Sequence, residues 1–324
     1  MVIVISSISN LAVQFYFLRR QSALPLSFDT REMKNLMRSS LPFLFSAVFL
    51  VGYMELDKVM ISLLADEQSI GWYGSANQLF GTLLFIPSVL MTAVFPALAR
   101  RSQADEHGFY RMSRTNLNLL LLLAIPMGLG LVAVAKPVVL LLFGPGFAPS
   151  GPILSVLGIV LILTYLNVFL GQTLISQDRQ NAWTWVMAVC TLATVPLDLV
   201  LIPWCAETFK NAGLGGALSF VITEAGMVVC GVYLLPRGML DRSTVVIALK
   251  SALAGLVMFP VAWLLQDQMI LVPILAGAIV YFGMAWMLGI LPMQYFQVYI
   301  EMARRWAARR FQGTFLAGIF SRDN

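Results

Sequence analysis

Long apolar runs separated by short polar segments make up most of the sequence. Nine runs have about the length of a helix that crosses roughly 30 Å of hydrocarbon, which is about 20 residues. They lie near residues 2–18, 39–64, 70–98, 117–143, 150–176, 182–203, 213–235, 244–266 and 269–290. Short segments of alternating polarity, which are typical of membrane β-barrels, are absent from the sequence. The pattern therefore predicts an all-α, polytopic membrane helix bundle with about nine transmembrane helices.

The composition supports a membrane protein without a soluble domain. Hydrophobic residues make up 59% of the chain and charged residues 11%, whereas a soluble domain carries roughly 25% charged residues. The polar stretches are far shorter than the roughly 50 residues that a domain needs. The three cysteines, Cys190, Cys205 and Cys230, have no pairing or metal-ligand spacing, so we expect neither a metal site nor a cofactor.

The basic residues predict the orientation of the bundle. Seventeen of them lie in the odd-numbered interhelical loops and the tail, and Lys210 alone lies in the even-numbered loops. The seventeen are Arg19, Arg20, Arg31, Lys34, Arg38, Arg100, Arg101, Arg111, Arg114, Arg179, Arg237, Arg242, Arg304, Arg305, Arg309, Arg310 and Arg322. By the positive-inside rule, the N-terminus is predicted outside and the C-terminus in the cytoplasm. The same asymmetry indicates anionic lipid at the cytoplasmic face and no nucleic-acid partner.

The two ends of the chain raise further expectations. The first helix has no basic residues before it and arginines after it, the reverse of a signal peptide, so the chain looks as if its beginning were missing. The tail, residues 291–324, contains "YFQVYIEMARRWAARRF", in which an apolar stripe recurs at three-to-four spacing beside arginines. We expect an amphipathic, basic helix at the cytoplasmic membrane surface.

Four motifs, in order, resemble those of a known family. They are "ELDKVMISLLADEQSIGWYGSANQL" from Glu55, "LFGPGFAPSGPILSVLGI" from Leu142, "LGQTLISQDRQN" from Leu170 and "VPLDLVLIPWCAETFKNAGLGGALSFVITE" from Val195. Together they are similar to the oligosaccharide flippases, the polysaccharide-transporter family of the superfamily that also contains multidrug and toxin extruders. The resemblance covers residues 39–236 by motif and the flanks by topology.

This resemblance implies a two-lobed transporter of which the chain supplies mainly the second lobe. Family members commonly have fourteen helices, six in each lobe and two at the end. We therefore expect residues 1–38 to be the last helix of a truncated first lobe with a linker, and 39–236 to be the six-helix second lobe. Residues 237–290 would then be the two additional transmembrane helices. A separate first lobe or a second copy of the chain would complete the transport path.

Ionisable residues within the apolar runs are the candidate site. An ionised residue at mid-membrane costs about 2.5–3.5 kcal/mol on insertion scales, so each needs a partner, water or a changed protonation state. Glu55 and Lys58, three residues apart, can form a local ion pair. Asp57 lies about 200° around the helix from Glu55, on the side of Tyr53 and Ile61. Two interpretations of Asp57 stay open: a hydrogen bond to a neighbouring helix, or a cavity role as ion or proton ligand.

Three other residues have the same two kinds of interpretation. Glu224 is the most deeply placed acid and is either cavity-facing or hydrogen-bonded between helices. Asp198 stands where the family usually has asparagine, which indicates either a protonatable site or a hydrated position near the outer interface. Lys136, near the outer end of its helix, either extends to the headgroups or contacts the substrate's pyrophosphate headgroup.

The resemblance implies a non-enzymatic flippase of the bacterial inner membrane. Its substrate would be an undecaprenyl-pyrophosphate-linked oligosaccharide for cell-surface polysaccharide or lipopolysaccharide biosynthesis, and its mechanism alternating access. One alternative is a cation-coupled multidrug exporter, with an aromatic pocket drawn from Trp72, Tyr73, Phe80, Tyr165 and Phe169. A second is a polysaccharide polymerase or glycosyltransferase, although the single histidine, His107, lies in a solvated loop. A third is a truncated chain that is inactive alone.

Overall fold

A computed structural model of the chain describes residues 2–21 and 30–290, and all of its regular elements there are helices. The chain divides into two units, residues 1–48 and 49–324. The first unit contains α1 (Val2–Gln21) and the start of α2 (Thr30–Leu64). The second contains the rest of α2 and the remaining helices: α3 (Glu67–Leu83), α4 (Phe85–Ala104), α5 (Glu106–Phe143), the 3₁₀-helix η1 (Pro145–Phe147), α6 (Ser150–Ile175), α7 (Gln180–Phe209), α8 (Ala212–Leu234), α9 (Arg242–Leu264) and α10 (Leu271–Met287).

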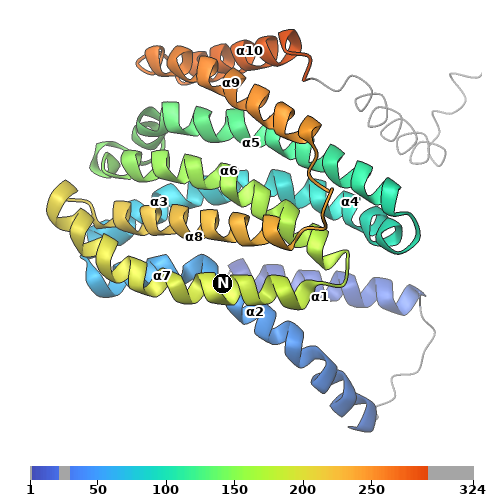
Figure 1. The fold of residues 1–324 in the computed structure, drawn as a ribbon. Coiled ribbons are helices and arrows are strands. Elements are labelled where there is room, and N and C mark those ends of the chain that lie inside the picture. Colours follow the sequence, from blue (N-terminus) through green and yellow to red (C-terminus); the bar gives the residue numbers. More distant parts are fainter. Residues whose placement is uncertain (1, 22–29, 291–324) are drawn as a thin grey trace, which may run out of the picture. The chain divides into compact units, whose positions relative to one another are not determined.

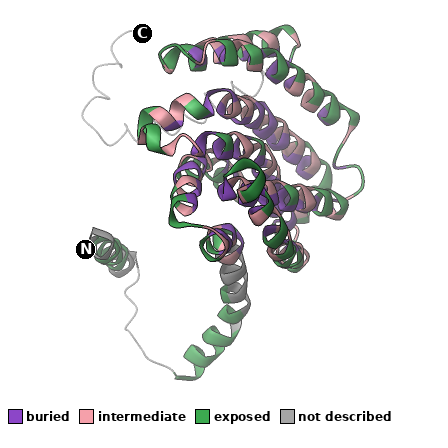
Figure 2. Ribbon diagram, turned by 90° about the vertical axis from the view of Figure 1, so that its left-hand side faces the viewer, coloured by how far each residue is buried: buried purple, intermediate pink, exposed green. Residues whose placement is uncertain are grey.

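Within the second unit, α6 is the central helix. It packs against α3, α4, α5, α7 and α8, while α9 and α10 pack against α5 and against each other. Figure 1 shows α5, α6 and α8 running side by side, with α9 and α10 beyond α5. Buried residues concentrate on α5, α6 and the inner faces of the helices around them (Figure 2). The core of the unit therefore lies around α6.

Six of the described helical segments are long and apolar enough to cross a membrane. The most buried is α6, and the least buried is the segment Glu67–Ala104, which consists of α3 and α4 in sequence. The apolar helix α10 is shorter than these spans. The all-α membrane bundle is thus confirmed, whereas the predicted total of nine spans stays a prediction. The predicted tail helix lies outside the described residues.

Four helices begin at a polar side chain in the preceding loop that caps their first turn. Asp66, Asp105, Asn211 and Asp241 each accept a hydrogen bond from the backbone N–H three residues later. Such caps satisfy amide groups that have no partner within the first helical turn. At Asp66, the hydrogen bonds from Ser69 lower the pKa of the carboxyl group.

At two prolines, a buried tyrosine from another helix donates to the carbonyl that the missing proline N–H leaves free. Proline has no N–H for the carbonyl four residues earlier. For Pro87 that carbonyl belongs to Leu83, and it accepts a 3.0 Å hydrogen bond from Tyr165 Oη on α6. Around Leu84 the predicted single helix 70–98 divides into α3 and α4.

The second such proline is Pro126, whose freed carbonyl on Leu122 accepts a 3.0 Å hydrogen bond from Tyr281 Oη on α10. This bond also joins α10 to α5. In both places a neighbouring helix satisfies a carbonyl group that would otherwise be unpaired in hydrocarbon.

Two close helix contacts depend on glycine. A Cβ atom at Gly128 on α5 would lie 2.5 Å from the carbonyl oxygen of Gly158 on α6. A Cβ atom at Gly215 on α8 would lie 2.4 Å from the carbonyl oxygen of Leu201 on α7. Small residues let membrane helices pack closely, and this packing holds α5, α6, α7 and α8 together.

Candidate functional site

Three carboxyl groups are buried among the apolar helices of the second unit. Asp57 comes from α2, Asp198 from α7 and Glu224 from α8, and their exposed fractions are 4%, 0% and 1%. The electrostatic neighbours of Asp57 include both other carboxyl groups. Helices that are far apart in sequence thus bring the three sequence-predicted acids into one cluster, which we call the carboxyl cluster.

The helical repeat explains why Asp57 is buried while its neighbours are not. Tyr53, Asp57 and Ile61 follow one another at four-residue spacing and are all buried, so they share the face of α2 that packs on the unit. Glu55 and Lys58 lie on the exposed side, where Lys58 Nζ is 2.7 Å from Glu55 Oε2. The two charges that pair by spacing are therefore separated from the single buried acid.

Asp57 and Asp198 face each other without a basic partner. Tyr73 Oη on α3 donates a 3.1 Å hydrogen bond to Asp57 Oδ2. The carboxyl group of Asp198 interacts with the carboxyl group of Asp57 and with the hydroxyl of Ser219, although in the described part of the chain neither pair has the full geometry of a hydrogen bond. The hydroxyl of Ser219 on α8 is equally buried and is the polar group on α8 that interacts with Asp198.

This arrangement of Asp57 and Asp198 has a chemical consequence. Two facing carboxylates away from water repel each other, and burying each negative charge is unfavourable unless a positive charge or a proton neutralises it. A proton shared between them, or a small cation bound by them, supplies the missing positive charge. The Ser219 hydroxyl and the oxygens of both carboxyl groups are suited to either. Among the described residues, no group of three or more His, Cys, Asp or Glu side chains is placed to hold a metal ion.

Glu224 forms hydrogen bonds to two other helices. Tyr53 Oη on α2 donates to Glu224 Oε1 over 2.6 Å. Asn167 Nδ2 on α6 donates both to the Glu224 backbone carbonyl, over 3.0 Å, and to its Oε2. Glu224 thus has hydrogen bonds between helices, and its predicted role in a cavity stays a prediction. Glu224 therefore joins α2, α6 and α8 next to the Asp57–Asp198 pair.

Sequence reasoning missed the uncharged partners in this cluster. Tyr53, Tyr73 and Asn167 each contact an acid on another helix, and no local spacing shows such a contact. One signal was available for Tyr53, because it lies one helical turn before Asp57 on the same face of α2. Tyr73 and Asn167 gave no comparable signal.

The least buried membrane helices, α3 and α4, carry a line of exposed polar side chains. These are Gln78 and Thr82 on α3 and Ser88 and Thr92 on α4, each pair at four-residue spacing and therefore on one face of its own helix. The three hydroxyl groups donate to carbonyls of the preceding turn, at 2.7–2.9 Å. We call these four residues the polar stripe; sequence reasoning did not single them out.

The exposed side of α7 differs from the polar stripe. Its exposed residues include Trp185, Val189, Leu192, Leu199 and Val200, all of which are apolar. An apolar face suits lipid, whereas polar groups in the bilayer normally face protein or water. Phe85 and Val89 are also exposed on α4, at 71% and 48%, so α3 and α4 present a mixed polar and apolar side where that of α7 is mainly apolar.

Comparison with known proteins gives a family match over the first part of the chain. Residues 2–152 match a family model described as polysaccharide biosynthesis protein. The predicted resemblance to the oligosaccharide flippase and polysaccharide-transporter family is confirmed. No curated protein sequence matches the chain.

A solved structure shares the flippase fold. The structure "Lipid II flippase MurJ, inward closed conformation" superposes with a TM-score of 0.66 at 17% sequence identity, over 84% of this chain. At this identity the likeness shows the fold alone. The chain spans 58% of the length of that flippase.

Apart from Tyr73, which donates to Asp57, the remaining sequence-predicted residues lie outside the carboxyl cluster. Lys136 is exposed on α5 against Gly151, and it is not among the charged neighbours of the three acids. His107 is exposed in the first turn of α5. Of the aromatic residues considered for a drug pocket, Tyr73, Phe80, Tyr165 and Phe169 are buried in the core. Trp72 Nε1 donates a 3.1 Å hydrogen bond to the carbonyl of Gly146.

Proposed function

We propose that the chain is the second lobe of a flippase that moves a lipid-linked oligosaccharide across the bacterial inner membrane. The oligosaccharide would be carried on undecaprenyl pyrophosphate and used for cell-surface polysaccharide or lipopolysaccharide. The observation that carries the proposal is the polar stripe, which gives α3 and α4 exposed hydroxyl and amide groups to which a glycan can bind. The match to polysaccharide biosynthesis proteins and the flippase fold support the same conclusion.

The transport path in this proposal lies between α3–α4 and a second, facing lobe. Hydroxyl and amide groups of Gln78, Thr82, Ser88 and Thr92 would hydrogen-bond to sugar hydroxyls while the polyprenyl chain stays in lipid. The facing lobe would be a separate first lobe or a second copy of this chain. Alternating access then follows from the two lobes rocking about the path, as in transporters built from repeats.

The proposed topology has nine spans, with the N-terminus outside and the C-terminus in the cytoplasm. Residues 1–38 would precede the lobe at 39–236, and 237–290 would add two helices that pack on α5. Residues 291–324 would lie at the cytoplasmic membrane surface. This orientation is supported by the distribution of arginine and lysine in the loops.

The carboxyl cluster would couple transport to an ion. Asp57 and Asp198 lie on α2 and α7 and would bind a proton or a monovalent cation between them. Binding would draw the two helices together, and release would separate them by charge repulsion. Glu224 would hold α2, α6 and α8 in register beside this site through its hydrogen bonds to Tyr53 and Asn167. Lys136 would lie away from the path and would not contact the pyrophosphate.

The test is translocation by the purified chain, together with any subunit that copurifies, in liposomes. The substrate is a fluorescent polyprenyl-pyrophosphate oligosaccharide, and a membrane-impermeant lectin reports its transfer. Gln78→Leu combined with Thr82→Val should slow transfer about tenfold or more, at about 1 kcal/mol for each lost hydrogen bond.

The matched control lies on the apolar face of α7. Val189→Leu combined with Leu192→Val changes side chains that should contact lipid, so transfer should stay at the wild-type rate. Equal transfer by the stripe variant and the wild type would contradict the proposed path. Export of hydrophobic cations without oligosaccharide transfer would indicate a drug exporter instead, and sugar transfer to an acceptor would indicate an enzyme.

A further inference from the structure

An apolar groove of about 400 Å³ lies between α8 and α9. Val232 on α8 and Leu249 on α9 form its sides, and Leu121 of α5 and Phe169 of α6 contribute to its floor. Leu240 and Thr244 line the end nearest the loop that joins α8 to α9. The groove lies away from both the carboxyl cluster and the polar stripe, which involve other faces of the bundle.

The groove is suited to an acyl chain. α8 packs on α6 and α7, whereas α9 packs on α5 and α10, so the space between α8 and α9 is open to the surroundings of the bundle. Its side residues Val232 and Leu249 are 42% and 66% exposed. In the hydrocarbon region those surroundings are lipid. An empty groove would forfeit dispersion contacts along its lining, and a lipid chain restores them.

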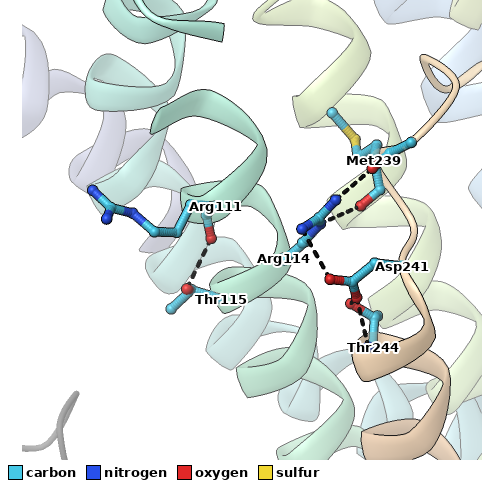
Figure 3. Close-up of polar contacts among 7 residues, drawn as sticks. Arg111, Arg114, Thr115, Met239, Asp241 and Thr244 are labelled. Carbon is cyan, nitrogen blue, oxygen red and sulfur yellow. Dashed lines mark hydrogen bonds and ion pairs between the residues drawn. The ribbon is translucent and has the colours of Figure 1, made fainter. Parts of the chain in front are cut away.

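The loop end of the groove is positively charged. Arg237 and Arg242 are exposed on either side of Leu240. The one acid of this loop, Asp241, already has a partner: Arg114 Nη1 lies 2.9 Å from Asp241 Oδ2, and the same guanidinium donates to the carbonyls of Gly238 and Met239 (Figure 3). Arg237 and Arg242 therefore keep their charge available for an anion.

The loop is also held in a fixed conformation. Asp241 caps α9 through Thr244 N at 2.8 Å and Thr244 Oγ1 at 2.9 Å, and Gly238 takes a left-handed backbone with φ of 89°. At the last turn of α8, Tyr233 is 88% exposed, and exposed tyrosine is typical of the headgroup level of a membrane. An apolar groove, a basic end and an interfacial aromatic residue thus occur together.

We propose that this groove binds one acyl chain of an anionic phospholipid, whose phosphate headgroup contacts Arg237 and Arg242. The two arginines would favour anionic over zwitterionic phospholipids, whereas the apolar groove would bind the acyl chain of both. Its place in the cytoplasmic leaflet rests on the proposed membrane orientation; the binding itself does not. A bound phospholipid would fill the space between the lobe and the α9–α10 pair.

The test is native mass spectrometry of the purified full chain with an equimolar mixture of phosphatidylglycerol and phosphatidylcholine. The wild type should retain phosphatidylglycerol preferentially. Arg237→Gln and Arg242→Gln should each lower the apparent affinity for phosphatidylglycerol about fivefold, from about 1 kcal/mol for each basic residue near a membrane surface, and leave phosphatidylcholine unchanged. Arg100→Gln, at an exposed arginine near the end of α4, is the matched control and should change neither.

A groove-filling variant tests the chain site separately. Ala248 lines the groove, so Ala248→Trp should reduce retention of both phospholipids while the protein stays monodisperse. Equal retention of the two lipids by the wild type, or arginine variants that bind like the control, would overturn the proposal. So would binding of undecaprenyl phosphate together with failure to bind phosphatidylglycerol. The lipid-binding test does not measure translocation, so the two proposals can fail separately. A chain that binds phosphatidylglycerol selectively but moves no oligosaccharide in liposomes would contradict the proposed function and leave the lipid site standing.

Discussion

Replacing Asp57 by asparagine separates a transport role from a structural one. Asp57→Asn keeps the volume of the side chain and removes its ability to carry a negative charge. The amide oxygen of the introduced asparagine can still accept the hydrogen bond that Tyr73 Oη donates to Asp57 over 3.1 Å. The variant thus loses at most one hydrogen bond, which is worth about 0.6 kcal/mol between membrane helices.

A larger effect acts in the opposite direction. Asp57 is 4% exposed, and the charged groups that interact with it, Asp198 and Glu224, are acidic. An ionised aspartate at mid-membrane costs about 2.5–3.5 kcal/mol on insertion scales, and asparagine removes that cost. We therefore expect Asp57→Asn to leave the thermal unfolding midpoint in detergent unchanged or raised. If Asp57 carries the coupling proton or cation, oligosaccharide transfer should fall at least tenfold.

The assay measures both quantities on the same preparation. Transfer is followed in liposomes with and without a pH or Na⁺ gradient, and unfolding by fluorescence-detected gel filtration after heating. Glu55→Gln is the matched control: it lies two residues away on the same helix, exposed and paired with Lys58, and should change neither quantity. Parallel loss of stability and transfer in Asp57→Asn would refute the coupling role, and so would wild-type transfer.

Three other substitutions test the packing and capping described above. Gly128→Ala should destabilise the bundle by about 1–3 kcal/mol because its Cβ would overlap the facing helix, whereas Gly130→Ala, with its nearest neighbour 3.9 Å away, should be close to neutral in the same heating assay. Tyr165→Phe should lower the free energy of unfolding by about 1 kcal/mol, because it leaves the Leu83 carbonyl, four residues before Pro87, without a donor. The choice of transported substrate should not change, and an unchanged unfolding midpoint would contradict this prediction. Hydrogen bonds from Thr244 and the charge of Arg114 lower the pKa of Asp241, so its stabilising contribution is complete above the ordinary pKa of about 3.9 and is lost as pH falls through the lowered value. The midpoint of the wild type should therefore drop more than that of Asp241→Asn between pH 6 and pH 3, and equal drops would show that the cap contributes nothing.

The sequence predicted the helices well where apolar length decided them. Residues 150–176 and 213–235 were expected as helices, and α6 and α8 occupy nearly the same ranges. The expectation for 70–98 missed the break around Leu84, because a proline kink depends on whether another helix can supply a donor to the freed carbonyl. That donor, Tyr165, is about 80 residues away in the chain.

The candidate site was predictable in its acids and not in their partners. Charge within an apolar run is visible in the sequence, so Asp57, Asp198 and Glu224 could be named. Helical spacing also separated Asp57 from the exposed Glu55–Lys58 pair. The hydrogen bonds to the buried acids come from other helices and follow from tertiary packing, which local spacing does not encode. The polar stripe was missed because single Ser, Thr and Gln residues are common in membrane helices, and only the structure shows that these four are exposed.

The most direct test of the flippase role is the leaflet distribution of the lipid-linked oligosaccharide in cells that encode this chain. Inverted membrane vesicles and spheroplasts expose opposite leaflets to an impermeant lectin, so the outer fraction can be measured whatever partner completes the path. Deleting the gene should confine the oligosaccharide to the cytoplasmic leaflet, and the wild-type chain, but not Asp57→Asn or the stripe variant, should restore the outer fraction. An unchanged outer fraction after deletion would contradict the proposal that this chain moves the oligosaccharide.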